Sequence, residues 1–265
     1  MDEDTPTRAY TLGLFVADGW IERRGKSFYI SCTDRQIIVD VAEAVDFTNK
    51  IVIGKAGWGS NKTGKMYRLG FAGRPLEQIK AMGFTADKTG GEFIPNTVSD
   101  TTLHHFLRGL TDGDGTWGVV AGKYLSWGMI SASESFLVLL LDRLRGLRVI
   151  RASGVQVKPR PSTNGVVYRI RLGHEDSVAL GDFMYQGTNL MLHRKHDIYM
   201  AHRDLNLKIH RWTPEELEMA LSGVCPPGRS RSAYHAKRWE MRRAAHQSTV
   251  SGCTEVRALT RAGTL

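Results

Sequence analysis

The stretch Thr11-Leu-Gly-Leu-Phe-Val-Ala-Asp18-Gly19 recurs in similar form as Leu107-Arg-Gly-Leu-Thr-Asp-Gly-Asp114-Gly115, and a tryptophan follows each copy. Two further pairs of segments repeat in the same order, about 100 residues apart. Matches that keep their order and nearly constant spacing indicate a duplication. The further pairs are Ile30-Ser-Cys-Thr-Asp34 with Ile130-Ser-Ala-Ser-Glu134, and Met66-Tyr-Arg-Leu69 with Val167-Tyr-Arg-Ile170.

Each half predicts the same succession: a helix, a hairpin, a second helix, two more strands and a third helix. The fold class is therefore α+β, with two pseudo-symmetric αββαββα repeats. Thr5-Pro6 starts the first helix, because a hydroxyl caps free amides and proline suits the first helical position. Thr33 and Ser133 are expected to cap the second helices in the same way. The expected segments are a first helix ending near Ala17, a hairpin joining Trp20–Arg24 to Lys26–Cys32 through Gly25, and second helices over Gln36–Val45 and Phe136–Leu147.

Small residues on one face of each motif helix predict that the two helices pack together. Gly13 and Ala17 are four residues apart, as are Gly109 and Gly113, so each pair lies on one helix face. Two such faces can approach backbone to backbone. We therefore expect the aspartates that follow them to lie together at the C-terminal ends of the helices.

These two residues, Asp18 and Asp114, are the candidate metal ligands. Each precedes a glycine, Gly19 or Gly115, that we expect to adopt the left-handed conformation of a helix cap. A carboxylate there faces the negative end of the helix dipole, and two together repel each other. A divalent cation removes both penalties, and oxygen ligands favour Mg²⁺, which can activate water for phosphodiester hydrolysis. The alternative is an ordinary pair of Asp-Gly turns.

The charge balance points to a polyanionic partner. The 265 residues include 36 lysines and arginines against 27 aspartates and glutamates, a formal net charge of +9. Nucleic acid is a frequent partner of such a protein, although an ordinary basic enzyme can have the same composition. Apolar and basic residues alternate in Met66-Tyr-Arg-Leu-Gly-Phe71 and in Val167-Tyr-Arg-Ile-Arg-Leu172, which predicts sheets with one buried and one cationic face. The candidate contacts to DNA are Arg24, Tyr29, Arg68, Arg169 and Arg171.

Other features argue against several classes of protein. No apolar run reaches the roughly 20 residues of a membrane-spanning helix. The three cysteines are odd in number and far apart, so neither a disulfide framework nor a zinc site is expected. The acidic start, Met1-Asp-Glu-Asp4, is unlike a secretory signal. We therefore expect a cytoplasmic protein without a membrane partner.

The last segment of the chain departs from the repeat. Thr213-Pro-Glu-Glu216 predicts a capped helix to about Ser222, and a second helix is expected from about Ser230. A helix, a turn and a basic helix are typical of major-groove readers. The alternative is a basic amphipathic tail packed on the rest of the protein. The segment is similar to Myb/SANT-like helix-turn-helix segments, and its candidate DNA contacts on one helix face are Arg231, Arg238 and Arg242.

Together, the duplicated motifs resemble the LAGLIDADG homing endonucleases that carry both motif copies in one chain. The likeness covers roughly residues 5–205. Val16 stands where the family name has its first aspartate, and Asp112 retains that residue in the second copy. The resemblance implies a monomer in which two repeats pack through their motif helices, and each contributes a saddle-shaped antiparallel sheet that lies along the DNA major groove.

The resemblance also implies an activity, the Mg²⁺-dependent hydrolysis of both strands of a specific double-stranded DNA site, leaving short 3′ overhangs. Basic residues after the third helix of each half are implied to assist catalysis. Lys88 fits this role loosely, and the run Leu192-His-Arg-Lys195 offers Lys195 and its neighbours, with a solvated basic loop as the alternative for both. The implied metal ligands are Asp18 and Asp114, with the carbonyls of Ala17 and Gly113.

The predicted organisation has three parts. A first repeat spans residues 1–95, a second spans 96–205, and a helix-turn-helix-like extension with a flexible tail spans 206–265. A second class of function stays open, namely a non-catalytic DNA-binding regulator derived from these nucleases, or an intron-splicing maturase. The presence of both motif aspartates favours the nuclease.

Overall fold

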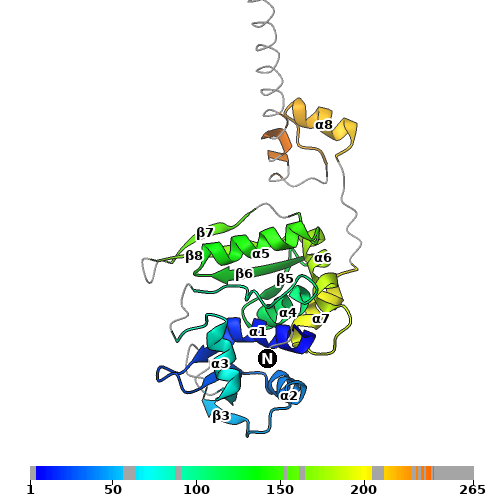
Figure 1. Ribbon diagram of the computed structural model, residues 1–265. Coiled ribbons are helices and arrows are strands. Elements are labelled where there is room, and N and C mark those ends of the chain that lie inside the picture. The colour runs from blue at the N-terminus through cyan, green and yellow to red at the C-terminus, as the bar shows by residue number, and fades with distance from the viewer. Residues whose placement is uncertain are drawn as a thin grey trace, which may run out of the picture. The chain divides into compact units, whose positions relative to one another are not determined.

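The computed structural model describes residues 4–55, 64–86, 91–151, 154–160, 165–204 and 212–227, together with positions 231, 234, 235, 237–239 and 241. The chain divides into two compact units, residues 1–207 and 208–265. Figure 1 shows helices packed against the strands of the first unit, which contains both copies of the repeat. None of the described helices is long and apolar enough to cross a membrane.

Both copies of the repeat share the order αββαββα, and the helix α7 (His193–His202) follows the second copy. Each forms a four-stranded antiparallel sheet, in the order β1-β2-β4-β3 in the first and β5-β6-β8-β7 in the second. The predicted duplication and α+β fold are confirmed. The first repeat consists of α1 (Pro6–Asp18), β1 (Gly19–Ile21), β2 (Phe28–Cys32), α2 (Arg35–Ala44), β3 (Val52–Lys55), β4 (Lys65–Phe71) and α3 (Arg74–Ala81). The second consists of α4 (Leu103–Gly113), β5 (Thr116–Val120), β6 (Tyr124–Ser131), α5 (Glu134–Gly146), β7 (Gln156–Arg160), β8 (Gly165–Arg171) and α6 (His174–Tyr185).

The predictions about helix N-termini have different outcomes. Thr5 caps α1, and its hydroxyl accepts a hydrogen bond at 3.3 Å from the amide three residues further on. Ser133 caps α5 in the same way. The cap of α2 is Asp34 rather than Thr33, because the carboxylate accepts a hydrogen bond at 3.1 Å from the amide two residues further on. The prediction of Thr33 is therefore wrong by one residue, and Asp34 is a residue type that caps helices equally well.

The prediction of left-handed glycines after the motif helices is wrong. Gly19 has a φ of −92° and an extended backbone, and Gly115 is not among the glycines with positive φ. Space rather than conformation requires glycine at these positions. A Cβ on Gly19 would lie 2.1 Å from the Phe15 ring, and one on Gly115 would lie 2.7 Å from the Cα of Thr111.

The two motif helices, α1 and α4, pack side by side within the first unit (Figure 1). A Cβ on Gly13 would lie 1.9 Å from the carbonyl oxygen of Phe106. One on Gly109 would lie 2.0 Å from the carbonyl oxygen of Tyr10. Real Cβ atoms do not approach backbone oxygens so closely, so only glycine permits this contact. The predicted close packing of the motif helices is confirmed.

Each sheet has one face packed on helices and one open face. On the packed face, Leu69 and Ile170 are 0% and 1% exposed. Because side chains alternate along a strand, Arg68 and Arg169 belong to the open face. Helix α2 packs against β2 and β4, and α5 packs against β6 and β8. The alternation predicted for these strands is confirmed.

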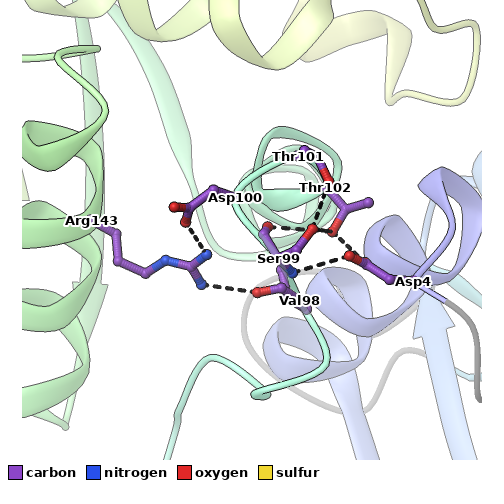
Figure 2. Close-up of polar contacts among 7 residues, drawn as sticks. All are labelled: Asp4, Val98, Ser99, Asp100, Thr101, Thr102 and Arg143. Carbon is purple, nitrogen blue, oxygen red and sulfur yellow. Dashed lines mark hydrogen bonds and ion pairs between the residues drawn. The ribbon is translucent and has the colours of Figure 1, made fainter.

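A polar cluster ties the start of α1 to the segment that leads into α4 (Figure 2). The Asp4 carboxylate accepts hydrogen bonds from the Ser99 amide at 3.3 Å and from the Thr102 hydroxyl. Helix α5 contacts the same segment through Arg143. This residue forms an ion pair with Asp100 at 2.5 Å and donates a hydrogen bond to the carbonyl of Val98 at 3.2 Å. The cluster therefore joins the two repeats at the end of the helix pair where α1 and α4 begin.

In the second unit, the predicted capping box of α8 (Pro214–Leu221) is confirmed. The Thr213 hydroxyl accepts from the Glu216 amide at 3.2 Å, and the Glu216 carboxylate accepts from the Thr213 amide at 3.0 Å. The described residues from position 231 onward are helical. Tyr234 is buried there, and its hydroxyl accepts a hydrogen bond from Arg238 at 3.0 Å.

The contact between the motif helices predicts a large effect of one methyl group. Gly13→Ala should lower the free energy of unfolding by at least about 2 kcal/mol, because the methyl group would press on a backbone carbonyl that cannot repack. Gly146→Ala is the matched control, since this glycine ends α5 and a Cβ there meets nothing within 4 Å. The control should be neutral or stabilising by up to about 1 kcal/mol. Chemical denaturation followed by circular dichroism compares them, and equal effects would contradict the backbone contact.

Candidate active site and nucleic-acid interface

The two motif aspartates lie at the same end of the helix pair. Asp18 is the last residue of α1, and Asp114 caps the C-terminus of α4. A Cβ on Gly113 would lie 2.2 Å from the Cβ of Ala17 and 3.1 Å from a carboxylate oxygen of Asp18, so the ends of the two helices touch. Asp18 is half-buried and Asp114 is exposed. Glycine packing therefore carries both carboxylates to one end of the pair.

Lys195, from α7, places its ammonium group at the C-terminus of α4. The residue is 6% exposed, and its Nζ lies within hydrogen-bonding distance of four backbone carbonyls. A cation there compensates the negative end of the helix dipole. Burial lowers the pKa of Lys195, and the attraction of Asp112, Asp18 and Asp114 opposes this shift. The carbonyls are those of Thr111 (2.7 Å), Asp112 (2.8 Å), Gly113 (3.0 Å) and Gly115 (2.7 Å).

Asp112 is a buried anchor rather than a site residue. Its Oδ2 accepts hydrogen bonds from the Tyr10 hydroxyl at 2.8 Å and from the Leu192 amide at 2.9 Å. Burial raises the pKa of Asp112 to about 6, although these hydrogen bonds and the charge of Lys195 act in the opposite direction. Tyr10 belongs to α1 and Leu192 directly precedes α7. One carboxylate thus connects both motif helices to the helix that supplies Lys195.

Arg108 is a second buried charge, and no motif in the sequence predicted its role. The residue is 1% exposed, and its guanidinium donates to the carbonyls of Leu190 at 2.8 Å and Met184 at 2.6 Å. It also donates to the Thr188 hydroxyl at 3.0 Å. Burial lowers its pKa to about 10. The available signal was a charged residue four positions before Asp112, between Leu107 and Gly109 of the motif helix. These bonds hold the connection between α6 and α7 against α4.

The donor groups at the helix ends fit a hard divalent cation. They are two carboxylates and backbone carbonyls, and all of them are oxygen ligands. In the part of the chain that the structure describes, no three His, Cys, Asp or Glu side chains gather as a metal centre. Mg²⁺ needs no such group, because one or two carboxylates commonly hold it while water and substrate phosphates complete its shell. The Gly113 carbonyl already accepts a hydrogen bond from Lys195 and would be shared.

The open face of the first sheet carries an aromatic pair and one arginine. The rings of Trp20 and Tyr29 are stacked, with centroids 5.1 Å apart and planes inclined by 22°. The Arg68 guanidinium carbon lies 4.8 Å from the Trp20 centroid and 5.6 Å from the Tyr29 centroid. Cation–π attraction holds the guanidinium beside the rings. Two of the predicted DNA contacts, Tyr29 and Arg68, thus form one cluster with Trp20.

The open face of the second sheet carries two arginines on the central strand β8. Arg169 donates to the Gln156 side chain at 2.8 Å, and Arg171 donates to the Ser126 hydroxyl at 3.2 Å. The two arginines are two residues apart and therefore point to the same side. The surface is cationic, as the alternation in the sequence predicts, and its arginines are held by hydrogen bonds rather than by rings.

The other predicted site residues lie elsewhere. Arg24 is exposed in the turn of the first hairpin. Arg231 is exposed and Arg238 is half-buried, and both belong to the second unit. Lys88 and Arg242 lie outside the described residues.

The position of Lys195 predicts a structural cost for its removal. Lys195→Met should lower the free energy of unfolding by about 3 kcal/mol or more, because the change leaves buried carbonyls unbonded and removes a cation from the buried Asp112. Arg194→Met is the matched control, since it removes the neighbouring charge from an exposed position of the same helix. The control should change stability by less than about 0.5 kcal/mol. Urea titrations measure both, and a Lys195→Met variant as stable as the control would contradict the buried cap.

Comparison with known proteins identifies the fold. No protein-family model matches the chain, and no curated protein sequence matches it. Among solved structures, the homing endonuclease I-WcaI bound to its DNA recognition sequence aligns with a TM-score of 0.52 and 11% identity, over 75% of this chain and 88% of that one. Full-length DUF199/WhiA from Thermatoga maritima aligns with a TM-score of 0.47 and 13% identity, over 78% of this chain and 63% of that one. The LAGLIDADG homing endonuclease I-LtrWI bound to target DNA aligns with a TM-score of 0.46 and 10% identity, over 82% of this chain and 96% of that one. At these identities the likeness concerns architecture, and the chain has the LAGLIDADG fold.

Proposed function

We propose that the protein is a site-specific double-strand DNA endonuclease, which hydrolyses phosphodiesters with Mg²⁺ and leaves 3′ overhangs. The observation that carries the proposal is the position of Asp18 and Asp114 at adjoining helix ends, in a unit whose two sheets each present at least one arginine on an open face. A single chain contains both halves of this arrangement, so a monomer suffices.

The DNA-binding part of the proposal rests on charge and surface. The open faces carry Arg68, Arg169 and Arg171, and the chain has a formal net charge of +9. Arginines on a sheet face can contact both phosphates and base edges. The homing endonuclease I-WcaI, which has the same fold, is bound to its DNA recognition sequence. The extension from residue 206 onward, with Arg231, Arg238 and Arg242, is proposed to add further DNA contacts.

The catalytic part assigns roles to residues at the helix ends. Asp18 and Asp114 would hold Mg²⁺ through carboxylate oxygens, with the carbonyls of Ala17 and Gly113 as additional ligands. When bound, the ion supplies an activated water and stabilises the leaving oxygen of the phosphodiester. Lys195 would act by compensating the charge of the α4 terminus rather than by touching DNA, because its Nζ is buried against four carbonyls. Lys88 is proposed to assist in the first half.

A DNA-binding protein without nuclease activity is the second candidate. The observation in its favour is the hydrogen bond from Lys195 to the Gly113 carbonyl, because a cationic side chain already occupies part of the proposed ligand set. Both candidates require the sheets to bind duplex DNA, and they differ only in whether the aspartates support hydrolysis. Substitution of the aspartates in a protein that still binds DNA therefore separates them.

Loss of either carboxylate should stop cleavage while leaving binding intact. Asp18→Asn or Asp114→Asn should reduce Mg²⁺-dependent cutting of a randomised duplex library by more than about a hundredfold. Substitution of a residue that only hydrogen-bonds to a metal ligand typically costs about 10- to 100-fold in activity, and a direct ligand should cost more. Asp142→Asn, at an exposed position of α5, is the control and should cut like the wild type. Sequencing the cut ends and measuring DNA binding by gel shift provide both readouts. Cutting that persists in both aspartate variants would refute the assignment, and a wild type that binds but never cuts would favour the second candidate.

Binding should depend steeply on salt. If the protein contacts six or more phosphates, raising the salt from 50 to 200 mM should weaken its binding to DNA by about 10³-fold or more. The reason is that each phosphate contact releases counterions, and added salt opposes this release. Removing one phosphate contact, for example with Arg171→Ala, should reduce the slope of log Kobs against log salt by about 1. Fluorescence anisotropy with a library-selected duplex measures the slope. A flat response would contradict DNA binding by the cationic faces.

A further inference from the structure

The aromatic cluster of the first sheet, defined as Trp20, Tyr29 and Arg68, is built before any ligand binds. Trp20 and Tyr29 are directly opposite on neighbouring strands, and Arg68 pairs with Ser31, two residues beyond Tyr29. Gly70 lies opposite Tyr29, and a Cβ there would lie 2.9 Å from the Tyr29 ring. The glycine therefore leaves the space that the Tyr29 ring occupies.

The Tyr29 ring is also fixed at its hydroxyl end. The Ser27 hydroxyl lies 2.9 Å from the Tyr29 hydroxyl and donates to the Glu22 carboxylate at 3.0 Å. Both partners belong to the first hairpin, so the ring is held by its own sheet. Arg68 thus packs beside a surface with little freedom to move, and its guanidinium loses less conformational entropy when it binds.

The donors of Arg68 lack acceptors in the described part of the protein. Its Nε is buried without a hydrogen-bond partner, and none of the described residues accepts a hydrogen bond from, or forms an ion pair with, its guanidinium. On the other sheet, Arg171 donates its Nε to Ser126. The Arg169 Nε is also buried without a partner, but the same guanidinium donates to Gln156 through a terminal nitrogen. A guanidinium has five N–H donors in a fixed fork, and an external acceptor that matches the fork would satisfy them.

The surroundings of Arg68 suit a base edge better than a phosphate. The residue lies on β4, between β2 and β3, and is therefore within the sheet rather than at its rim. Its cross-strand neighbour Val52 is apolar and 51% exposed, and the two rings beside it are apolar as well. On the open face of β1 to β4, the described strands offer no second lysine or arginine. Phosphate tracks usually combine several cations and amide donors, whereas apolar surfaces suit bases and thymine methyl groups.

We propose that Arg68 determines base specificity by reading the O6 and N7 atoms of one guanine in the major groove. This inference rests on the proposed function, because it requires the first sheet to bind duplex DNA. A basic side chain paired with guanine is the most frequent specific contact in the major groove. At a bidentate, ring-stacked site such as this one, lysine does not replace the planar fork of arginine. Trp20 and Tyr29 act as positioning residues that hold the guanidinium for this contact. The second sheet, with its hydrogen-bonded arginines, would supply more of the phosphate contacts.

Selection of duplexes from a randomised library, by binding in the absence of divalent metal, tests the inference. The wild-type motif should include a guanine that Arg68→Lys no longer selects, while preferences at other positions persist. Lysine retains the charge but neither the fork nor the flat stacking surface. On the best wild-type duplex, Arg68→Lys should bind roughly 10- to 100-fold more weakly, and replacing that guanine by adenine should cost the wild type a similar factor. The Arg68→Lys variant should bind the duplex with adenine at that position as tightly as it binds the duplex with guanine.

Arg169→Lys is the matched control, because it makes the same substitution on the open face of the other sheet. It should retain the guanine that depends on Arg68. A Trp20→Leu variant should weaken selection of the same guanine and of no other base, and thermal unfolding verifies that each variant is folded. The inference is overturned if Arg68→Lys selects the wild-type motif unchanged. It is also overturned if Arg68→Ala weakens binding to all sequences equally and lowers the slope of log Kobs against log salt, because the contact is then to phosphate. If the wild type selects no sequence at all, the proposed function itself fails, and this inference fails with it.

Discussion

The backbone contact between α1 and α4 is the constraint on which the rest of the structure depends. Gly13 and Gly109 each leave room for a carbonyl oxygen of the opposite helix. The two helices therefore lie closer together than any residue with a Cβ atom at these positions would permit. Their C-terminal ends therefore meet, and Asp18 and Asp114 come to the same end of the pair. At the other end, the Asp4 cluster joins the chain before α1 to the chain before α4 (Figure 2). The helix pair is thus held at both ends.

The two halves are not equivalent at this joint. The C-terminus of α4 is compensated by Lys195, and Asp112 connects it to Tyr10 of α1 and to the chain before α7. In the first repeat, the position that corresponds to Asp112 is Val16, which is buried and cannot make such bonds. Buried charges are costly unless they are paired and bonded, so the network of the second repeat depends on all its members. The duplicated fold therefore carries one polar and one apolar version of the same junction.

The two sheets differ in the same sense. On the first, the Arg68 guanidinium is held by two aromatic rings and has no described acceptor. On the second, Arg169 and Arg171 are held by the hydrogen bonds that they donate to Gln156 and Ser126. Two halves that share a topology thus present surfaces of different chemistry. Under the proposed function, such a scaffold would suit a DNA site whose two halves differ in sequence.

Local and periodic features follow from the sequence alone. The repeat, the strand alternation, the caps Thr5 and Ser133 and the small faces of the motif helices are visible there, because each depends on residues a few positions apart. The left-handed state expected of Gly19 is wrong, since glycine is required at that position by the nearby Phe15 ring and not by its φ angle. The position of Lys195 under the carbonyls of α4, about 80 residues earlier, required three-dimensional packing to bring the two segments together. The cluster of Trp20, Tyr29 and Arg68 likewise arises only from strand register, because no local pattern states which residues of distant strands lie opposite each other.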